Sequence, residues 1–298
     1  MVILHGRSRY WCGRPGRHLR AVLLTAVLVP VALLLPQVPL HGVQAAPAAQ
    51  VPGDPAAAGT FPVRFQGVAF TLDPDLAPYV KWRVVPAVAP QLAPSLGGGA
   101  PQHVQFAFVA GPDRPTPDIL DPHAAQLRVF PVAGLRALDP GVDAGVDALR
   151  ALLDARPAAP EGQLPVFPPP SASQAIRAQV RYLDFPGGSG VRFVTAYQQD
   201  VSPITNQRLL YTFQGLTADG RAYVSLVWPV SAHALPSTYE EALGGQSYSA
   251  FSEQFEAYLA HTTQLVNDSP AGAFTPDLVR LDGLLRTLTI ALASPGGQ

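Results

Sequence analysis

The alternation of apolar and polar residues is clearest between Gly190 and Val230, where a period of two runs through three segments. It predicts one strand over residues 191–198 and a second over 209–217. Asp219-Gly220 then predicts a two-residue hairpin into the third segment, because a type I′ turn requires a positive φ at both central residues. The region therefore reads as an antiparallel meander.

Counting outward from that turn fixes which residues face each other across the hairpin. One face is apolar and contains four cross-strand pairs: Thr217–Ala222, Gly215–Val224, Phe213–Leu226 and Tyr211–Trp228. The other face is more mixed and contains three: Leu216–Tyr223, Gln214–Ser225 and Thr212–Val227. We expect the apolar face to be buried and the mixed face to be exposed to solvent or only partly covered.

Three upstream segments also have strand character, namely residues 68–72, 103–109 and 126–132. Pro131 confines the last of these to a sheet edge or to the end of a strand, because proline has no N–H to donate. The glycine- and proline-rich segment 87–101 reads as an irregular loop.

Helical periodicity appears three times. The first helix begins at Asp139-Pro140 and is stopped by Pro157, and the second covers about residues 247–266. The third starts at Thr275-Pro276-Asp277 and carries leucines at spacings of three and four, with a polar opposite face: Leu278, Leu281, Leu285, Leu288, Leu292, and opposite them Arg280, Asp282 and Arg286. Strands followed by amphipathic helices predict an α+β fold, an antiparallel sheet with helices packed on one face.

The N-terminus has the pattern of a secretory signal peptide. Five arginines and no acidic residue precede a mostly apolar stretch over residues 21–40. Small residues around Gln44 predict cleavage after Ala45, which makes residues 1–45 the signal peptide. About 20 apolar residues also suffice to span a bilayer, so an uncleaved membrane anchor is the alternative. We expect an exported protein, periplasmic or extracellular.

Removal of this segment changes the composition of the chain. The formal charge goes from −1 to −6, because 15 basic residues remain against 21 acidic ones. The only cysteine, Cys12, leaves with the signal, so disulfides, thiolate metal sites and a cysteine nucleophile are excluded. A mildly acidic surface does not suit nucleic acid. We expect a flexible Ala/Pro-rich tether over residues 46–60 and a single domain over 61–293, with no transmembrane helix after processing.

Familiar catalytic and metal motifs are missing from the sequence. No Gly-x-Ser-x-Gly elbow occurs, and Gly188-Ser189-Gly190 reads as a glycine turn before a strand. The four histidines that remain after cleavage are isolated from one another, which does not suit zinc: His103, His123, His233 and His261. Asp139, Asp143 and Asp147 recur every fourth residue and predict a solvated helix face rather than a calcium loop. We assign no catalytic, cofactor-binding or metal residue, and no cofactor.

Two weaker patterns remain as candidates. Carboxylates for glycoside hydrolysis can come from anywhere in a chain, and four are considered: Asp184, Asp200, Glu240 and Glu241. Asp219 is interpreted as a turn residue. A cleft between sheet and helices could use aromatic residues on adjacent strands and polar residues near strand ends: Tyr197, Tyr211, Tyr223, Trp228, Arg192, Asp200 and Asn206. Core packing and turn chemistry explain the same residues, so neither set is assigned as a site.

Segment 190–200, the Pro203–Asn206 turn, the hairpin over residues 210–225, Pro229-Val230 and the later Phe274–Leu278 together resemble a family of uncharacterised bacterial exported proteins and lipoproteins. The resemblance covers residues 61–292 and implies no activity. This chain lacks the lipobox cysteine of the lipoprotein members. The order of strands and helices is also similar to PsbP/Mog1-like domains, at the level of fold alone.

We therefore expect a non-catalytic binding or interaction module of the cell envelope or the secreted fraction. Its partner would be an envelope protein or an extracellular ligand. A secreted, glycosidase-like hydrolase with dispersed carboxylates is the alternative. Two carboxyl groups about 5–9 Å apart in an open groove would favour that alternative.

Overall fold

The computed structural model describes residues 59–292 apart from 90–98, 118–120, 122–123 and 139. The predicted signal peptide and residues 46–58 of the predicted tether lie outside the described residues. The main element is a seven-stranded antiparallel sheet with the order β3-β4-β5-β9-β8-β7-β6. Its strands are β3 (Tyr79–Val85), β4 (His103–Val109), β5 (Gln126–Pro131), β6 (Ser173–Phe185), β7 (Gly188–Gln198), β8 (Leu210–Thr217) and β9 (Ala222–Pro229).

Two smaller sheets complete the strand content of the described residues. One has the order β1-β2-β12 and the other pairs β10 with β11; their strands are β1 (Phe61–Phe65), β2 (Val68–Leu72), β10 (Ser231–Ala232), β11 (Phe274–Thr275) and β12 (Thr289–Ile290). The β1–β2 hairpin turns at Gln66 and Gly67, both with positive φ (49° and 75°). This is the dihedral pattern of a type I′ turn.

Six α-helices lie in the described residues: α1 (Val132–Arg136), α2 (Pro140–Ala155), α3 (Tyr239–Leu243), α4 (Tyr248–Glu253), α5 (Phe255–Asp268) and α6 (Leu278–Arg286). Two 3₁₀ turns are also present: η3 (Asn206–Arg208) lies between β7 and β8, and η4 (Ala271–Ala273) lies between α5 and β11. The predicted helix after Pro140 is confirmed. Its predicted face is the buried one: Val142, Val146, Leu149 and Leu153. The N-cap position Asp139 lies outside the described residues.

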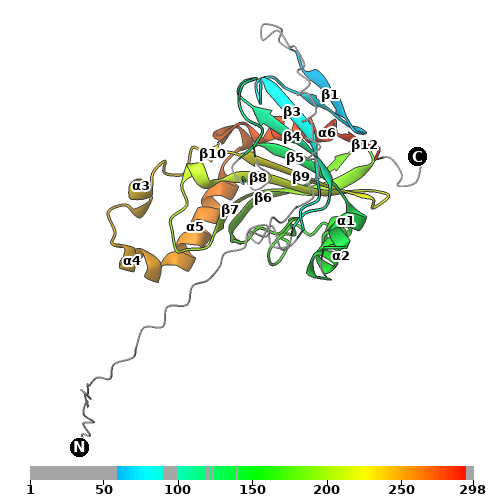
Figure 1. Ribbon diagram of the computed structural model, residues 1–298. Coiled ribbons are helices and arrows are strands. Elements are labelled where there is room, and N and C mark those ends of the chain that lie inside the picture. The colour runs from blue at the N-terminus through cyan, green and yellow to red at the C-terminus, as the bar shows by residue number, and fades with distance from the viewer. Residues whose placement is uncertain (1–58, 90–98, 118–120, 122–123, 139, 293–298) are drawn as a thin grey trace, which may run out of the picture. The chain divides into compact units, whose positions relative to one another are not determined.

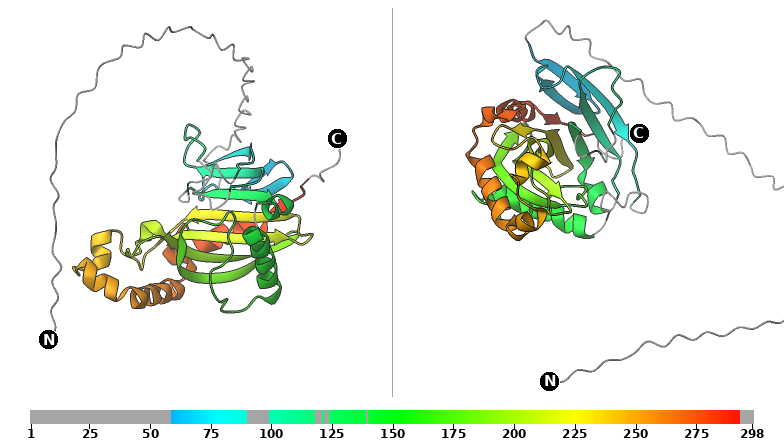
Figure 2. Two further views of the ribbon diagram at one scale, coloured as in Figure 1. Left: turned by 60° about the horizontal axis from the view of Figure 1, so that its bottom comes forward. Right: turned by 90° about the vertical axis from the view of Figure 1, so that its left-hand side faces the viewer.

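The α+β class and the antiparallel sheet are confirmed. The expectation that helices cover one face alone is wrong, because helices lie on both faces (Figure 1, Figure 2). α5, α6 and the β1-β2-β12 sheet pack against the face that carries Phe213 and Leu226. α1 and α2 pack against the face that carries Leu216 and Tyr223. Leu216 and Tyr223 are apolar residues of the mixed face, and α2 buries them.

The hairpin register is confirmed, with Phe213 opposite Leu226 and Gln214 opposite Ser225. The type I′ turn is wrong. The Gly220 N–H donates to the Thr217 carbonyl (2.8 Å), so the tight turn is centred one residue earlier, and Gly220 has a positive φ (68°) whereas Asp219 does not. The Asp219 carboxylate instead accepts hydrogen bonds from the Thr217 hydroxyl (2.6 Å) and the Arg221 N–H (3.0 Å), which confirms it as a turn residue.

Two helix predictions need correction. The segment 247–266 is not one helix: it breaks at Gln254 into α4, which buries Phe251, and α5, which buries Thr262 and Val266. The last helix does not reach Leu292 but ends at Arg286. The Thr287 hydroxyl donates to the Leu284 carbonyl and accepts from the Thr71 N–H, after which Thr289 and Ile290 pair with β2. Ser294-Pro295-Gly296, the sequence that would end a helix reaching Leu292, lies outside the described residues.

Asp282 was expected on the polar, outward face of the last helix, yet it is buried (1 % exposed). Both of its oxygens accept from the Arg192 guanidinium at 3.1 Å, and the Tyr211 hydroxyl donates to it at 2.9 Å. The prediction that Arg192 lies near a strand end is therefore wrong, because Arg192 joins the middle of β7 to α6. The apolar stripe of α6 and this ion pair seat the helix on the sheet together.

Candidate functional site

The mixed face of the sheet is apolar at one end of β5, β9, β8 and β7 and more polar at the other end. At the hairpin end, Phe130, Tyr223, Leu216 and Phe193 are buried beneath α2. At the other end, Gln126 and Arg128 of β5, Val227 of β9, Thr212 of β8 and Tyr197 of β7 border a cavity of about 500 Å³, hereafter the main cavity. The expectation that this face is exposed or only partly covered is wrong: its six hairpin residues are at most 9 % exposed, because α2 covers one end and the far wall of the cavity covers the other.

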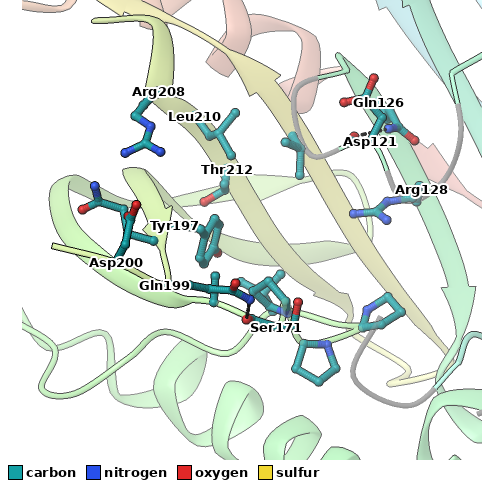
Figure 3. A pocket seen from close by; sticks show the side chains of 17 residues that line it. Asp121, Gln126, Arg128, Ser171, Tyr197, Gln199, Asp200, Arg208, Leu210 and Thr212 are labelled. Carbon is teal, nitrogen blue, oxygen red and sulfur yellow. Dashed lines mark hydrogen bonds between the residues drawn. The ribbon is translucent and has the colours of Figure 1, made fainter. Parts of the chain in front are cut away.

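Residues of segment 166–172, including three prolines, also line the cavity and form a second wall, and Figure 3 shows Ser171 of this wall close to Gln199. This wall is firmly attached. The Tyr223 hydroxyl accepts from the Phe167 N–H (2.8 Å) and donates to the Gln214 side chain, and the Gln199 amide donates to the Ser171 carbonyl. The cavity is therefore held between a sheet and a fixed segment, as ligand sites usually are.

Two guanidinium groups and two carboxylates line the main cavity: Arg128, Arg208, Asp121 and Asp200. Arg128 is 8 % exposed and its guanidinium lies 5.8 Å from the centre of the Phe130 ring. Burial lowers the pKa of Arg128, and the nearby Tyr223 and Tyr197 partly oppose that effect. An arginine stays charged even so. The cavity thus has a positive charge in a poorly hydrated wall.

Arg208 and Asp200 differ from Arg128 in being more exposed. Neither side chain makes a hydrogen bond or ion pair with any residue that the structure describes. Figure 3 places both at the same end of the cavity, away from Arg128 and Asp121. These two groups are available to a ligand without first breaking an internal contact.

Neutral polar groups complete the lining. Gln198 is 7 % exposed, and its Nε2 donates to the Ser202 carbonyl (2.9 Å) while its Oε1 has no partner among the described residues. The Tyr197 hydroxyl interacts with Gln174 but does not meet it in normal hydrogen-bond geometry. Burial raises the pKa of Tyr197 well above its usual value, so the hydroxyl keeps its proton and can donate. Buried polar atoms normally have partners, and a ligand would provide them here.

The residues proposed for a cleft are only partly brought together. Tyr197 and Asp200 line the main cavity, and Tyr223 anchors its wall. Tyr211 and Trp228 belong to the core on the other face of the sheet, as their place in the hairpin register requires. Arg192 is paired with Asp282, and the Asn206 amide donates to the Ser237 hydroxyl (3.1 Å).

The sequence interpretation missed Arg128, Arg208, Gln126 and the segment 166–172. A signal for part of this set was present. Gln126 and Arg128 alternate with Leu127 and Val129 in one strand, which indicates a strand with one polar face. Which polar face borders a cavity depends on the sheet order, and the sequence did not give that order.

The four candidate carboxylates do not gather in one place. Asp184 pairs with Arg156, which lowers the pKa of its carboxyl group, and both are largely exposed. Glu241 accepts from the Ser237 and Thr238 N–H groups as part of a capping box at α3, and Glu240 lies in the first turn of that helix. Asp200 is the one of the four that lines the main cavity.

The aspartates of α2 have a structural role. The guanidinium of Arg136 in α1 pairs with the exposed carboxylates of Asp143 and Asp147, and its hydrogen bond lowers the pKa of Asp147. This supports the predicted solvated face for these two residues. Within the described part of the chain, no group of three or more histidine, cysteine or acidic side chains is placed to hold a metal ion. His123 lies outside it.

His103 of β4 is buried beside Phe130, at the hairpin end of the mixed face. Its ring stacks on Phe130 with centroids 4.3 Å apart, its Nδ1 donates to the Pro101 carbonyl (2.8 Å), and its Nε2 has no partner among the described residues. Burial, together with smaller effects of Arg128 and Arg83, lowers the pKa of His103 to about 4 in spite of the opposing hydrogen bond to Pro101. The folded protein therefore holds this imidazole neutral.

This geometry predicts an acid-sensitive term in the free energy of unfolding. As the pH falls from about 6.5 to about 4, the unfolded chain takes up a proton on His103 that the folded protein excludes. The free energy of unfolding should fall by about 3 kcal/mol over this window. Urea unfolding at several pH values measures it. His103→Leu should flatten this part of the profile, whereas His261→Leu at an exposed site should leave it unchanged; equal profiles for all three proteins would contradict the prediction.

The described helices include none that is both long enough and apolar enough to cross a membrane. No family model matches this chain. Searches of the curated proteins and of the solved structures give no match either. The likenesses to a family of exported proteins and to PsbP/Mog1-like domains stay predictions. The case for function consequently rests on the geometry of the main cavity.

Proposed function

We propose that this protein is a non-catalytic binding module of the cell envelope or the secreted fraction, and that it holds a polar ligand in the main cavity. The observation that carries the proposal is the set of buried polar side chains that line this cavity. Arg128 and Gln198 are more than nine-tenths buried there and border a cavity of about 500 Å³, within the range of ligand sites. The Gln198 Oε1 has no hydrogen-bond partner among the described residues, and burying such an atom is costly unless a ligand satisfies it.

Export is part of the proposal and is supported by the arginine-rich, then apolar, pattern of residues 1–45. An envelope location agrees with a mature chain that has no cysteine and a formal charge of −6. The resemblance to exported proteins without known activity also supports it.

The glycosidase-like alternative is not favoured by this cavity. Its two carboxylates, Asp121 and Asp200, lie at opposite ends of the lining in Figure 3. Asp184, Glu240 and Glu241 are engaged elsewhere or lie on α3. A glycosidase requires an acid and a second carboxylate on either side of one glycosidic bond.

Filling the main cavity tests the proposal. Ala172 lines the second wall, so Ala172→Trp should occupy the cavity without altering the strands. Ala257→Trp, at an exposed position on α5, is the matched control. Four probes are used: galacturonate, glucose, phosphate and trialanine. Their binding is measured by thermal unfolding and by titration calorimetry. A probe at 100 times its Kd stabilises the protein by about 2.7 kcal/mol.

The expected result is that at least one probe stabilises the wild type and Ala257→Trp, and that its affinity falls at least tenfold in Ala172→Trp. A probe that stabilises all three proteins equally would place binding outside the main cavity. That result would contradict the proposal.

A further inference from the structure

A second hollow adjoins the main cavity. It has a volume of about 610 Å³ and is lined by Ser202, Thr205, Gln207, Ser237, Thr238 and Tyr239, together with Pro203 and Arg208. Arg208 borders both spaces. The Gln198 side chain of the main cavity donates to the Ser202 carbonyl of the second hollow, so the two linings are also connected by a hydrogen bond.

The segment between the two hollows is held in place from several sides. The Ile204 N–H donates to the Tyr258 hydroxyl (2.7 Å), and this hydroxyl donates to the Ile204 carbonyl (3.2 Å), which ties the segment to α5. The Asn206 N–H donates to the Pro236 carbonyl (2.9 Å), and the Asn206 side chain donates to Ser237. Arg208 therefore projects from a fixed backbone. A backbone that is already fixed loses less entropy on binding.

From these observations we infer that the main cavity and the second hollow are two subsites of one groove for an acidic oligosaccharide, with Arg208 binding the acid group where the subsites meet. The inference deepens the proposed function and rests on it. It assigns a ligand class and a minimum length of two sugar units.

The charges of the groove favour this class. Arg208 has no side-chain partner among the described residues and matches a carboxylate in a bidentate manner. A simple polyanion bound to Arg208 would also meet Asp200 at the same end of the main cavity, and this carboxylate would repel it. A sugar acid has hydroxyl groups that can donate to Asp200 and an acid group that accepts from the Arg208 guanidinium, so it suits both charges.

The neutral lining agrees with the same ligand. Amide and hydroxyl groups of Gln198, Gln199 and Ser202 suit sugar hydroxyls, and the Tyr239 side chain, 39 % exposed, offers a ring for the apolar face of a sugar. A peptide that binds by adding a strand to the sheet would need a free strand edge. The main cavity instead lies over β5, β9, β8 and β7, all internal strands of the sheet.

The test measures how affinity depends on ligand length. Galacturonate and trigalacturonate are titrated into the purified protein by calorimetry, with maltotriose as the neutral trisaccharide and trialanine as the peptide. The variants are Arg208→Gln and Tyr239→Ala. Their matched controls are Arg181→Gln, which removes an exposed charge on β6, and Tyr248→Ala, which removes an exposed tyrosine on α4.

Trigalacturonate should bind at least tenfold more tightly than galacturonate. Tyr239→Ala should remove that gain while galacturonate still binds, and Arg208→Gln should weaken both acids at least tenfold. The two controls should match the wild type. Circular dichroism and unfolding temperature verify that every variant is folded.

Equal affinities for the two acids, weakened by Ala172→Trp, would overturn the two-subsite inference and leave the proposed function intact. Tighter binding of maltotriose or trialanine than of trigalacturonate would overturn the acidic class and likewise leave the proposed function. Binding that Ala172→Trp does not affect would overturn both.

Discussion

Replacing Asp282 with alanine should lower the free energy of unfolding by about 3–5 kcal/mol. Arg192 and Asp282 are both almost fully buried, and the carboxylate also accepts the Tyr211 hydroxyl. The alanine variant leaves the Arg192 charge in the core between β7 and α6 without its counterion, which is far more costly than the loss of the attraction itself. For a domain of this size the midpoint of thermal unfolding should fall by about 10 °C.

Asp184→Ala is the matched control, because it also removes one carboxylate from an arginine pair. That pair is exposed, with 41 % and 68 % of the two side chains accessible, so its loss should cost less than about 1 kcal/mol. The double variant Arg192→Met with Asp282→Leu should recover much of the lost stability, since it leaves neither charge buried. Similar unfolding midpoints for Asp282→Ala and Asp184→Ala would show that the buried pair does not seat α6.

Gly190→Val should lower the free energy of unfolding by about 3 kcal/mol, although valine favours strands and glycine weakens them. Gly190 of β7 lies opposite Gly215 of β8, and the Phe213 ring lies over both. A Cβ at Gly190 would be 2.2 Å from the Phe213 Cζ and 2.7 Å from the Gln214 carbonyl oxygen. Phe213 is fully buried and packs on Phe185, so it has no space to withdraw.

Gly283→Ala should change the free energy of unfolding in the opposite direction. Gly283 lies in α6, and a Cβ there would meet no atom within 4 Å. The alanine variant should raise the free energy of unfolding by roughly 0.5–1 kcal/mol, through the lower backbone entropy of the unfolded chain. Denaturant unfolding of both variants measures the difference. A Gly190→Val protein as stable as the wild type would contradict the packing of Phe213.

The hairpin shows why part of this fold could be predicted from the sequence. The register of β8 and β9 follows from a period of two counted from a Gly-containing turn, and it survived even though the turn is centred one residue earlier than expected. Counting outward is tolerant of turn type because the same residues oppose each other in both cases. The stripe of α2 followed in the same way from local periodicity.

Long-range pairing explains what could not be predicted. The end of α6 is set by Thr71 and β2, more than 200 residues away, and no local signal announces that partner. Arg192 and Asp282 are 90 residues apart, so each reads as a surface charge until α6 is placed on β7. The main cavity is a further case. The main cavity is lined by β5 and β9, which are neighbours in the sheet. Their pairing cannot be read from the order of the strands along the chain.

A crystal structure of the protein grown with trigalacturonate tests the central claim most directly, namely that the polar half of the sheet face is the ligand site. We expect density for the sugar over β8 and β7, with a carboxylate on Arg208 and the next unit toward Tyr239. Density for the sugar elsewhere on the protein, or only ordered water in the main cavity at saturating trigalacturonate, would contradict the assignment of this cavity as a site for an acidic sugar.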